Sequence, residues 1–245
     1  MTAAPDVNIR VMKDYEDLSR AAAHLFIERG KAALAKTDRF TAALSGGSTP
    51  RRFYALLGSS HYCNDLNWKR VHFFWADERC VPPDHEESNF KLVHDTLLSS
   101  IEIPPDNIHR IRGEEDPDRA AQDYEQDIKT FFGGDRPAFD LIVLGVGTDG
   151  HTASVFPASK AVREIGLIVV PVFMNKPKIH RVTLTLPVIN LAAHVIMLAS
   201  GRSKAGIVRE ILSEQNRKKY PAGLVHPAGG DLTWLIDHEA SEQLK

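Results

Sequence analysis

The chain has 245 residues, of which 43% are hydrophobic and 25% charged, and its formal net charge is −2. This length allows a sizeable core, and so flat a charge balance disfavours a nucleic-acid-binding protein. The two cysteines, Cys63 and Cys80, form neither a disulfide framework nor a zinc-type grouping, and their reactivity depends on burial. The first residues lack the build of a signal peptide, and no window approaches the roughly 18 uncharged apolar residues of a membrane span. We therefore expect a cytoplasmic protein with no membrane or nucleic-acid partner.

Short apolar runs alternate with helix-like segments along the chain. The expected strands are Val7–Met12, Phe40–Leu44, Val71–Ala76, Leu141–Leu144, Val182–Leu186 (half-buried by its alternation), His194–Ala199 and Leu232–Asp237. The first expected helix is capped by Asp14 and buries the face formed by Leu18, Ala21, Ala22, Leu25, Ala32 and Ala33. A second helix follows Pro50, and another is capped by Asp116, begins at Pro117 and stops at Gly133. Two more are expected over Ser88–Ser100 and Ser203–Leu212. This alternation predicts an α/β, Rossmann-like fold: a mainly parallel sheet with helices on both faces, in a single domain over residues 1–245.

Four polar or glycine-rich segments follow expected strands. They are Ser45–Pro50, Asp77–Val81, Gly145–Pro157 and Ser200–Lys204. Because parallel strands end at one edge of a sheet, and ligands bind at that edge, we expect these distant segments to converge on one site.

Two of these segments suit an anion. Gly46 and Gly47 allow backbone N–H groups to turn toward a phosphate, and Ser48 and Thr49 add hydroxyl donors at a helix start. An ordinary tight turn, with Ser or Thr capping the helix, explains the segment equally well. Lys204 stands in the first turn of a later helix and can reach a phosphate held there; a surface lysine is the alternative. A serine nucleophile at Ser200–Lys204 is disfavoured because the second glycine of the elbow motif is missing.

The segment Gly145–Gly150 matches the glycine pattern of dinucleotide-binding proteins. Pro157 stands where the crossover helix should run, and no acidic residue follows the apolar run Gly166–Val170 to hold a ribose. We therefore expect no nicotinamide cofactor.

The same segment places Asp149 and His151 at the end of a strand. An imidazole suits general-base catalysis near neutral pH, and Asp149 can orient it or bind a hydroxyl. A carboxylate that caps a turn beside a solvent-facing histidine is the alternative.

Two further groups of charges lie near expected strands. In Asp77–Arg79, Arg79 can grip a phosphate, although a solvated ion-pair cluster is commoner for such triplets. The basic cluster Lys176, Lys178, His180 and Arg181 is expected to be a solvated loop from which Arg181 can face the site. No metal-ligand spacing is present. The residues alone thus indicate an enzyme for a small phosphorylated substrate, with no cofactor or metal.

Six motifs in order carry a family resemblance. They are Leu44–Pro50 (LSGGSTP), Asp77–Arg79 with Val81-Pro82 and Ser88-Asn89, Gly145–Pro157 (GVGTDGHTASVFP), Arg181–Asn190 (RVTLTLPVIN), Ser200–Ala205 (SGRSKA) and Leu232–Asp237 (LTWLID). Together they resemble the 6-phosphogluconolactonase family. The resemblance implies hydrolysis of 6-phospho-D-glucono-1,5-lactone to 6-phosphogluconate, the second step of the oxidative pentose phosphate pathway. We expect the protein to be a monomer or a weak homo-oligomer.

The resemblance also implies roles for individual residues. His151 would activate water, with Asp149 as its partner, Arg79 as a donor to the carbonyl oxygen or the phosphate, and Asp77 as a further site residue. The phosphate would rest on Gly46, Gly47, Ser48 and Thr49, with Lys204 and Arg181 neutralising it.

Three other functions stay open. The related glucosamine-6-phosphate isomerases typically carry a glutamate where this chain has Phe156, and isomerisation needs more proton-transfer groups than hydrolysis does. A non-catalytic sugar-phosphate sensor would keep the phosphate loops without needing His151. A dehydrogenase is disfavoured by Pro157.

Overall fold

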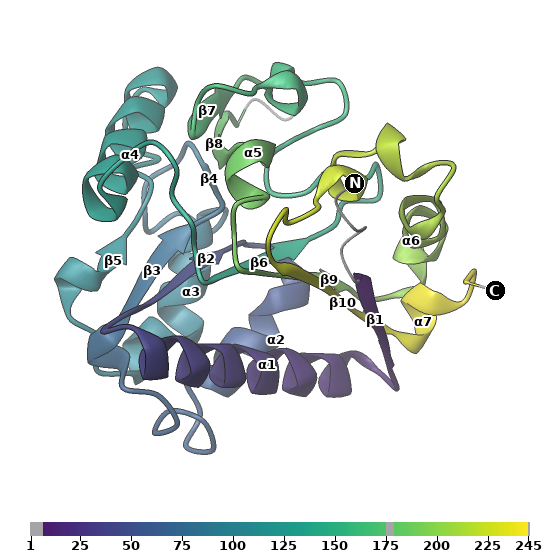
Figure 1. Ribbon diagram of the computed structural model, residues 1–245, viewed down its shortest axis with the longest axis horizontal. Coiled ribbons are helices and arrows are strands. Elements are labelled where there is room, and N and C mark those ends of the chain that lie inside the picture. Colours follow the sequence, from purple (N-terminus) through teal and green to yellow (C-terminus); the bar gives the residue numbers. More distant parts are fainter. Residues whose placement is uncertain (1–6, 175–178, 245) are drawn as a thin grey trace.

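The computed structural model describes residues 7–174 and 179–244, and its largest element is a seven-stranded sheet (Figure 1). All paired strands in it are parallel, in the order β1-β10-β9-β6-β2-β3-β5. Its strands are β1 Val7–Met12, β2 Phe40–Leu44, β3 Val71–Trp75, β5 Ile108–His109, β6 Leu141–Gly145, β9 His194–Ala199 and β10 Asp231–Asp237. The predicted mainly parallel sheet is confirmed.

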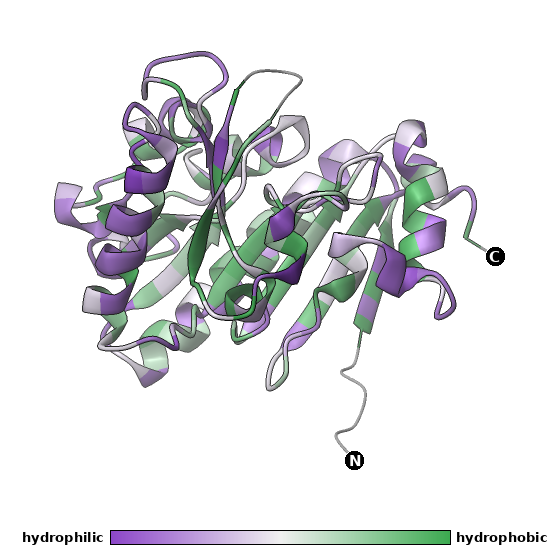
Figure 2. Cartoon of the chain, turned by 90° about the horizontal axis from the view of Figure 1, so that it is seen from above, coloured by the Kyte–Doolittle hydropathy of each residue, from purple (hydrophilic) through white to green (hydrophobic). Residues whose placement is uncertain are grey.

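Helices cover both faces of this sheet. Helices α1 and α2 lie together on one face, and α4 and α5 lie on the other (Figure 1). Hydrophobic residues concentrate on the central strands, whereas α4 turns a hydrophilic side outward (Figure 2). The helices are α1 Tyr15–Lys36, α2 Ser48–Leu57, α3 Asn89–Thr96, α4 Pro117–Phe132, α5 Leu186–Ile189, α6 Ala205–Leu212 and α7 His238–Ser241. None of the helices in the described part of the chain has the length and apolar content that a membrane crossing requires.

Local chemistry fixes the ends of the helices. The Asp14 carboxylate accepts the Asp17 N–H at 2.9 Å and starts α1, as predicted. Helix α4 starts after Asp116 and ends at Gly133, whose φ of 74° is left-handed. Three expectations were wrong. Ala32 is exposed because the last turns of α1 are only partly covered, and α6 starts at Ala205, after a 3₁₀ turn over Arg202–Lys204. The helix expected over Ser88–Ser100 ends at Thr96, before a 3₁₀ turn.

A second, antiparallel sheet was not predicted. It pairs β4 Asp77–Arg79, β8 Arg181–Leu184 and β7 Val169–Val172 in the order β4-β8-β7. The expected strand Val182–Leu186 ends at Leu184, and it is buried rather than half-buried. Its threonines tolerate burial because their hydroxyls are bonded; Thr183 Oγ1, for example, donates to the Leu184 carbonyl at 3.0 Å.

The solvated-cluster interpretation of Asp77–Arg79 is also wrong, because Asp77 and Glu78 are buried in β4. Glu78 accepts the backbone N–H groups of Asn89 and Phe90 at 2.7 Å each. Burial raises the pKa of Glu78 to about 7, although these amides and that of Arg79 favour the ionised form. The Glu78 carboxylate thereby ties β4 to the first turn of α3.

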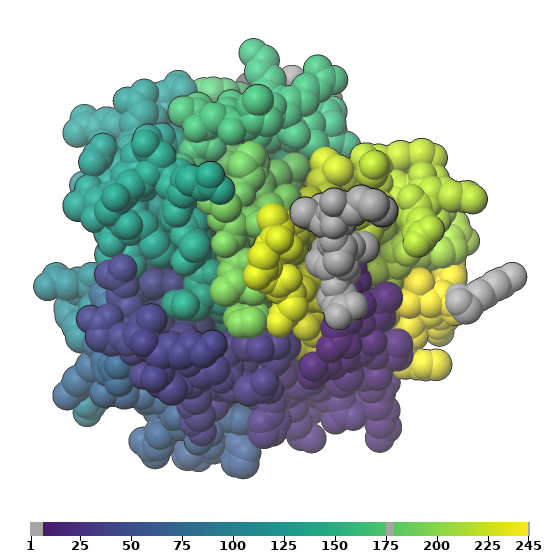
Figure 3. All heavy atoms as spheres, viewed as in Figure 1, coloured from purple at the N-terminus to yellow at the C-terminus, as the bar shows by residue number. Residues whose placement is uncertain are grey.

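The large sheet's first and last strands in chain order, β1 and β10, are neighbours in space. Strand β1 pairs with β10 along its whole length, from Val7 beside Leu232 to Met12 beside Asp237. The purple N-terminal and yellow C-terminal parts of the surface meet accordingly (Figure 3).

Candidate active site

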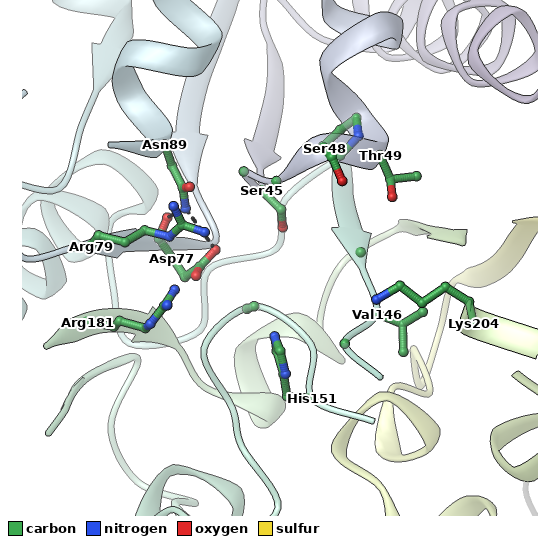
Figure 4. A pocket seen from close by; sticks show the side chains of 16 residues that line it. Ser45, Ser48, Thr49, Asp77, Arg79, Asn89, Val146, His151, Arg181 and Lys204 are labelled. Atoms are coloured by element: carbon green, nitrogen blue, oxygen red, sulfur yellow. Dashed lines mark hydrogen bonds between the residues drawn. The ribbon is translucent and has the colours of Figure 1, made fainter. Parts of the chain in front are cut away.

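The four predicted segments meet at the carboxyl edge of the large sheet around one cavity of about 190 Å³. Figure 4 shows this pocket from close by. Its lining comprises Ser45, Gly46, Gly47, Ser48, Thr49, Pro50, Asp77, Arg79, Asn89, Gly145, Val146, Gly147, His151, Ala153, Arg181 and Lys204. The predicted convergence is therefore confirmed. Of the predicted site residues, Asp149 alone does not line the cavity, and it contacts His151 instead.

His151 is held from two sides. Its Nδ1 lies 2.5 Å from Asp149 Oδ1, and its ring centroid lies 4.4 Å from that of Phe156. Burial by itself would raise the pKa of Asp149, but the His151 amide and imidazole lower it below its usual value. A carboxylate only accepts hydrogen bonds, so Nδ1 carries the proton and Nε2 keeps a free lone pair. This arrangement suits a general base.

The turn after His151 is strained at the edge of the cavity. Ala153 has a φ of 46°, a left-handed conformation that non-glycine residues rarely adopt. Neighbouring bonds hold it, since the Ser154 N–H donates to Thr183 Oγ1 at 3.2 Å and the Val155 N–H donates to the Thr152 carbonyl at 2.9 Å. No crossover helix follows this segment, where a dinucleotide-binding motif would require one; the next helical element is a 3₁₀ turn at Lys160–Arg163.

The start of α2 offers backbone donors to the cavity. Gly47 is the residue that caps this helix, with a φ of 100°, and its cap position makes no side-chain hydrogen bond. The alternative in which Ser or Thr caps the helix is therefore wrong, and the cap residue offers no side-chain oxygen to the amides of the first turn, whose residues line the cavity. Lys204 enters from the turn before α6; its burial lowers its pKa, an effect that Asp149 partly counters.

Two arginines face each other on the opposite side of the cavity from Lys204 (Figure 4). Arg79 of β4 and Arg181 of β8 are directly paired across the small sheet. Burial, and then the charge of Arg79, lower the pKa of Arg181. Among the described residues, Nε of each arginine is buried without a hydrogen-bond partner, although Arg79 Nη1 donates to the Glu87 carbonyl at 2.5 Å. Like charges placed opposite each other repel, so this end of the pocket favours an anionic or electron-rich group.

Asp77, the first residue of β4, is buried in the wall of the cavity. Its Oδ2 accepts from Ser154 Oγ at 2.6 Å, and its Oδ1 accepts from Asn89 Nδ2 at 3.3 Å. Ser154 is fully buried, and nothing in its local sequence distinguishes it. Ser45 and Asn89 line the cavity, although the sequence analysis did not identify either as an individual site residue. Asn89 had one signal, the Ser88-Asn89 pair of the family resemblance, in which Ser88 caps α3.

Lys176 and Lys178 of the predicted basic cluster lie outside the described residues, so for them the solvated loop stays a prediction. Arg181 belongs to β8 and lines the cavity, as expected of it. Cys63 and Cys80 are both half-buried free thiols, and burial raises the pKa of Cys80 to about 11, which disfavours the reactive thiolate. Within residues 7–174 and 179–244, no three His, Cys, Asp or Glu side chains are grouped as metal ligands.

Replacing Gly46 by alanine should abolish most activity. A Cβ at this position would lie 1.7 Å from Asn89 Oδ1 and 2.3 Å from its Cγ, so the loop or the buried amide must move. We expect a fall in kcat/KM of roughly 100-fold or more, because small displacements of positioning groups carry such costs. Gly134→Ala, where no atom lies within 4 Å, is the matched control, and steady-state kinetics of both variants would check this. Wild-type kinetics for Gly46→Ala would show that the close packing here is dispensable.

Comparisons with known proteins agree with these observations. Residues 13–234 match the family model described as glucosamine-6-phosphate isomerases/6-phosphogluconolactonase. A 6-phosphogluconolactonase of Synechocystis is 39% identical over 99% of each chain, and one of Homo sapiens is 39% identical over 96% of this chain and 93% of its own. The solved 6-phosphogluconolactonase of Trypanosoma brucei superposes with a TM-score of 0.87 at 30% identity, covering 99% of this chain and all of that one. The chain belongs to the family of glucosamine-6-phosphate isomerases and 6-phosphogluconolactonases.

Proposed function

We propose that this protein hydrolyses 6-phospho-D-glucono-1,5-lactone to 6-phosphogluconate, the second step of the oxidative pentose phosphate pathway. The observation that carries the proposal is one small cavity that joins an Asp149-bound imidazole, a helix start without a capping side chain beside a lysine, and an arginine pair. The names of the similar proteins support the same reaction.

The proposed chemistry uses His151 twice. Its Nε2 takes a proton from water while the water oxygen attacks the lactone carbonyl carbon and the carbonyl electron pair moves to oxygen. When that pair returns, the bond from the carbonyl carbon to the ring oxygen breaks, and the imidazolium gives its proton to the leaving ring oxygen. Asp149 stabilises the imidazolium between the two steps. The product acid then ionises to a carboxylate.

The two cationic ends of the cavity bind different parts of the substrate in this proposal. We assign the phosphate to Gly46, Gly47, Ser48 and Thr49 with Lys204, since the helix start and the lysine share that side (Figure 4). Arg79 then faces the carbonyl oxygen, which gains negative charge during attack. The family resemblance gives Arg181 to the phosphate, but its pairing with Arg79 favours the carbonyl end.

The proposal is tested with freshly generated 6-phosphogluconolactone, measured against an enzyme-free control because this lactone also opens spontaneously. Wild-type protein should accelerate its hydrolysis. If it does not, ammonia release from glucosamine-6-phosphate would identify the isomerase/deaminase alternative. Binding of either compound without turnover would indicate the sensor.

Activity should survive treatment with EDTA. An activated ester attacked by water with an imidazole base needs no Lewis acid, and the described residues group no metal ligands. We expect the same kcat/KM before and after the chelator is added and removed by dialysis. Complete loss of activity, reversed by zinc, would contradict this mechanism.

A further inference from the structure

Besides the two arginine Nε atoms, two buried oxygens of cavity-lining residues have no hydrogen-bond partner among the described residues. Ser45 is 4% exposed and Asn89 is 1% exposed, and both line the pocket. Ser45 Oγ and Asn89 Oδ1 nevertheless make no hydrogen bond among the described residues. Because buried polar groups are nearly always bonded, two such atoms in one cavity call for an explanation.

Each residue is held by hydrogen bonds that do not use its unpartnered oxygen. The Ser45 backbone carbonyl accepts the Tyr54 hydroxyl at 2.6 Å, which anchors the residue without using Oγ. Asn89 Nδ2 donates to the Asp77 backbone carbonyl at 2.8 Å and to Asp77 Oδ1 at 3.3 Å. Reversing this amide would set its oxygen against two acceptors, so Oδ1 stays on the Gly46 side.

The position of the pair restricts what can bind it. Ser45 and Asn89 lie across the cavity from His151, and Ser45 lies between Lys204 and the two arginines (Figure 4). An ionised phosphate or carboxylate oxygen has no proton for Asn89 Oδ1. A hydroxyl can donate to Asn89 Oδ1 and accept from Ser45 Oγ, and therefore satisfies both.

We propose that Ser45 and Asn89 form a subsite that binds one ring hydroxyl of the substrate and determines specificity for it. This inference rests on the proposed function, which supplies a ring with hydroxyls between a phosphate and a reacting carbonyl. The subsite rejects a lactone that lacks the hydroxyl, because that lactone leaves both protein oxygens unpaired in the complex.

The experiment measures kcat/KM for 6-phosphogluconolactone and for its three analogues that lack the hydroxyl at C2, C3 or C4. The enzymes are wild type, Ser45→Ala, Asn89→Leu and the control Ser59→Ala, which lies beyond the far end of α2. Wild type should hydrolyse one analogue about 100-fold less efficiently than the parent. Ser45→Ala should lower kcat/KM on the parent roughly 10-fold, yet distinguish that analogue from the parent by only about threefold. Ser59→Ala should keep the wild-type discrimination.

Two results would overturn the subsite. The first is that the variants lower kcat/KM for all four lactones by the same factor. The second is that wild type hydrolyses all three analogues as efficiently as the parent lactone. Melting temperatures verify folding, and if Asn89→Leu does not fold, Ser45→Ala decides alone because it removes a single oxygen. No hydrolysis of the parent lactone by wild type would instead defeat the proposed function, and the subsite with it.

Discussion

Replacing His151 by alanine should lower kcat for 6-phosphogluconolactone by roughly two to four orders of magnitude and leave KM near its original value. This is the usual range for a lost general base, and the ring takes no part in the proposed phosphate contacts. The Asp149 contact leaves Nε2 as the group that takes the proton from water. Initial rates over a range of lactone concentrations, corrected for spontaneous opening, would measure both constants.

The control is His24→Ala, which removes an exposed histidine of α1 that contacts Tyr62. It should behave as wild type. Asp149→Asn should reduce kcat in the same direction as His151→Ala, because an amide no longer fixes the proton on Nδ1. An unchanged kcat in His151→Ala would exclude the imidazole as the base, and a raised KM alone would make it a binding residue.

Replacing Lys204 by alanine should raise KM by roughly 10- to 100-fold and change kcat little. A charge-assisted bond to phosphate is made equally in the ground state and the transition state, so its loss weakens binding uniformly. Inorganic phosphate should inhibit the wild type competitively and the variant far more weakly. Since burial lowers the pKa of Lys204, phosphate inhibition should also fade at a lower pH than an exposed lysine would allow.

Two further variants sharpen this result. Lys13→Ala removes an exposed lysine near β1 and should leave phosphate inhibition intact. Arg181→Gln separates the two assignments of Arg181: inhibition by phosphate persists if Arg181 serves the carbonyl end, and weakens as in Lys204→Ala if it serves the phosphate. A large fall in kcat with unchanged KM in Lys204→Ala would refute its binding role.

The large sheet was predictable because its signals are local. Strands β1, β2 and β9 have their predicted bounds, since each is a run of apolar or alternating residues with clear punctuation. The small sheet was not predictable in this way. Strand β4 is a three-residue run of charges, and its burial depends on partners outside the strand. Asp77 bonds to Ser154, 77 residues away, and Glu78 bonds to the first turn of α3, 11 and 12 residues away.

The same contrast between local signals and contacts between distant segments applies to the site. Its convergence could be predicted because parallel strands share an edge, and the pairing of His151 with Asp149 is local in sequence. The contacts of Asn89 and Ser154 with Asp77 exist only in the folded chain. The orientation of Arg181 toward Arg79 likewise depends on antiparallel pairing between segments about 100 residues apart.

The parallel pairing of β1 with β10 bears on how the protein is made. Val7–Met12 and its partner, Asp231–Asp237, lie more than 200 residues apart along the chain, and β1 is synthesised well before β10. Until β10 is synthesised, β1 has no strand partner and β9, once made, has an open edge, and contacts this distant in sequence form slowly. A chain that terminates before β10 therefore leaves both β1 and the edge of β9 available to other nascent chains.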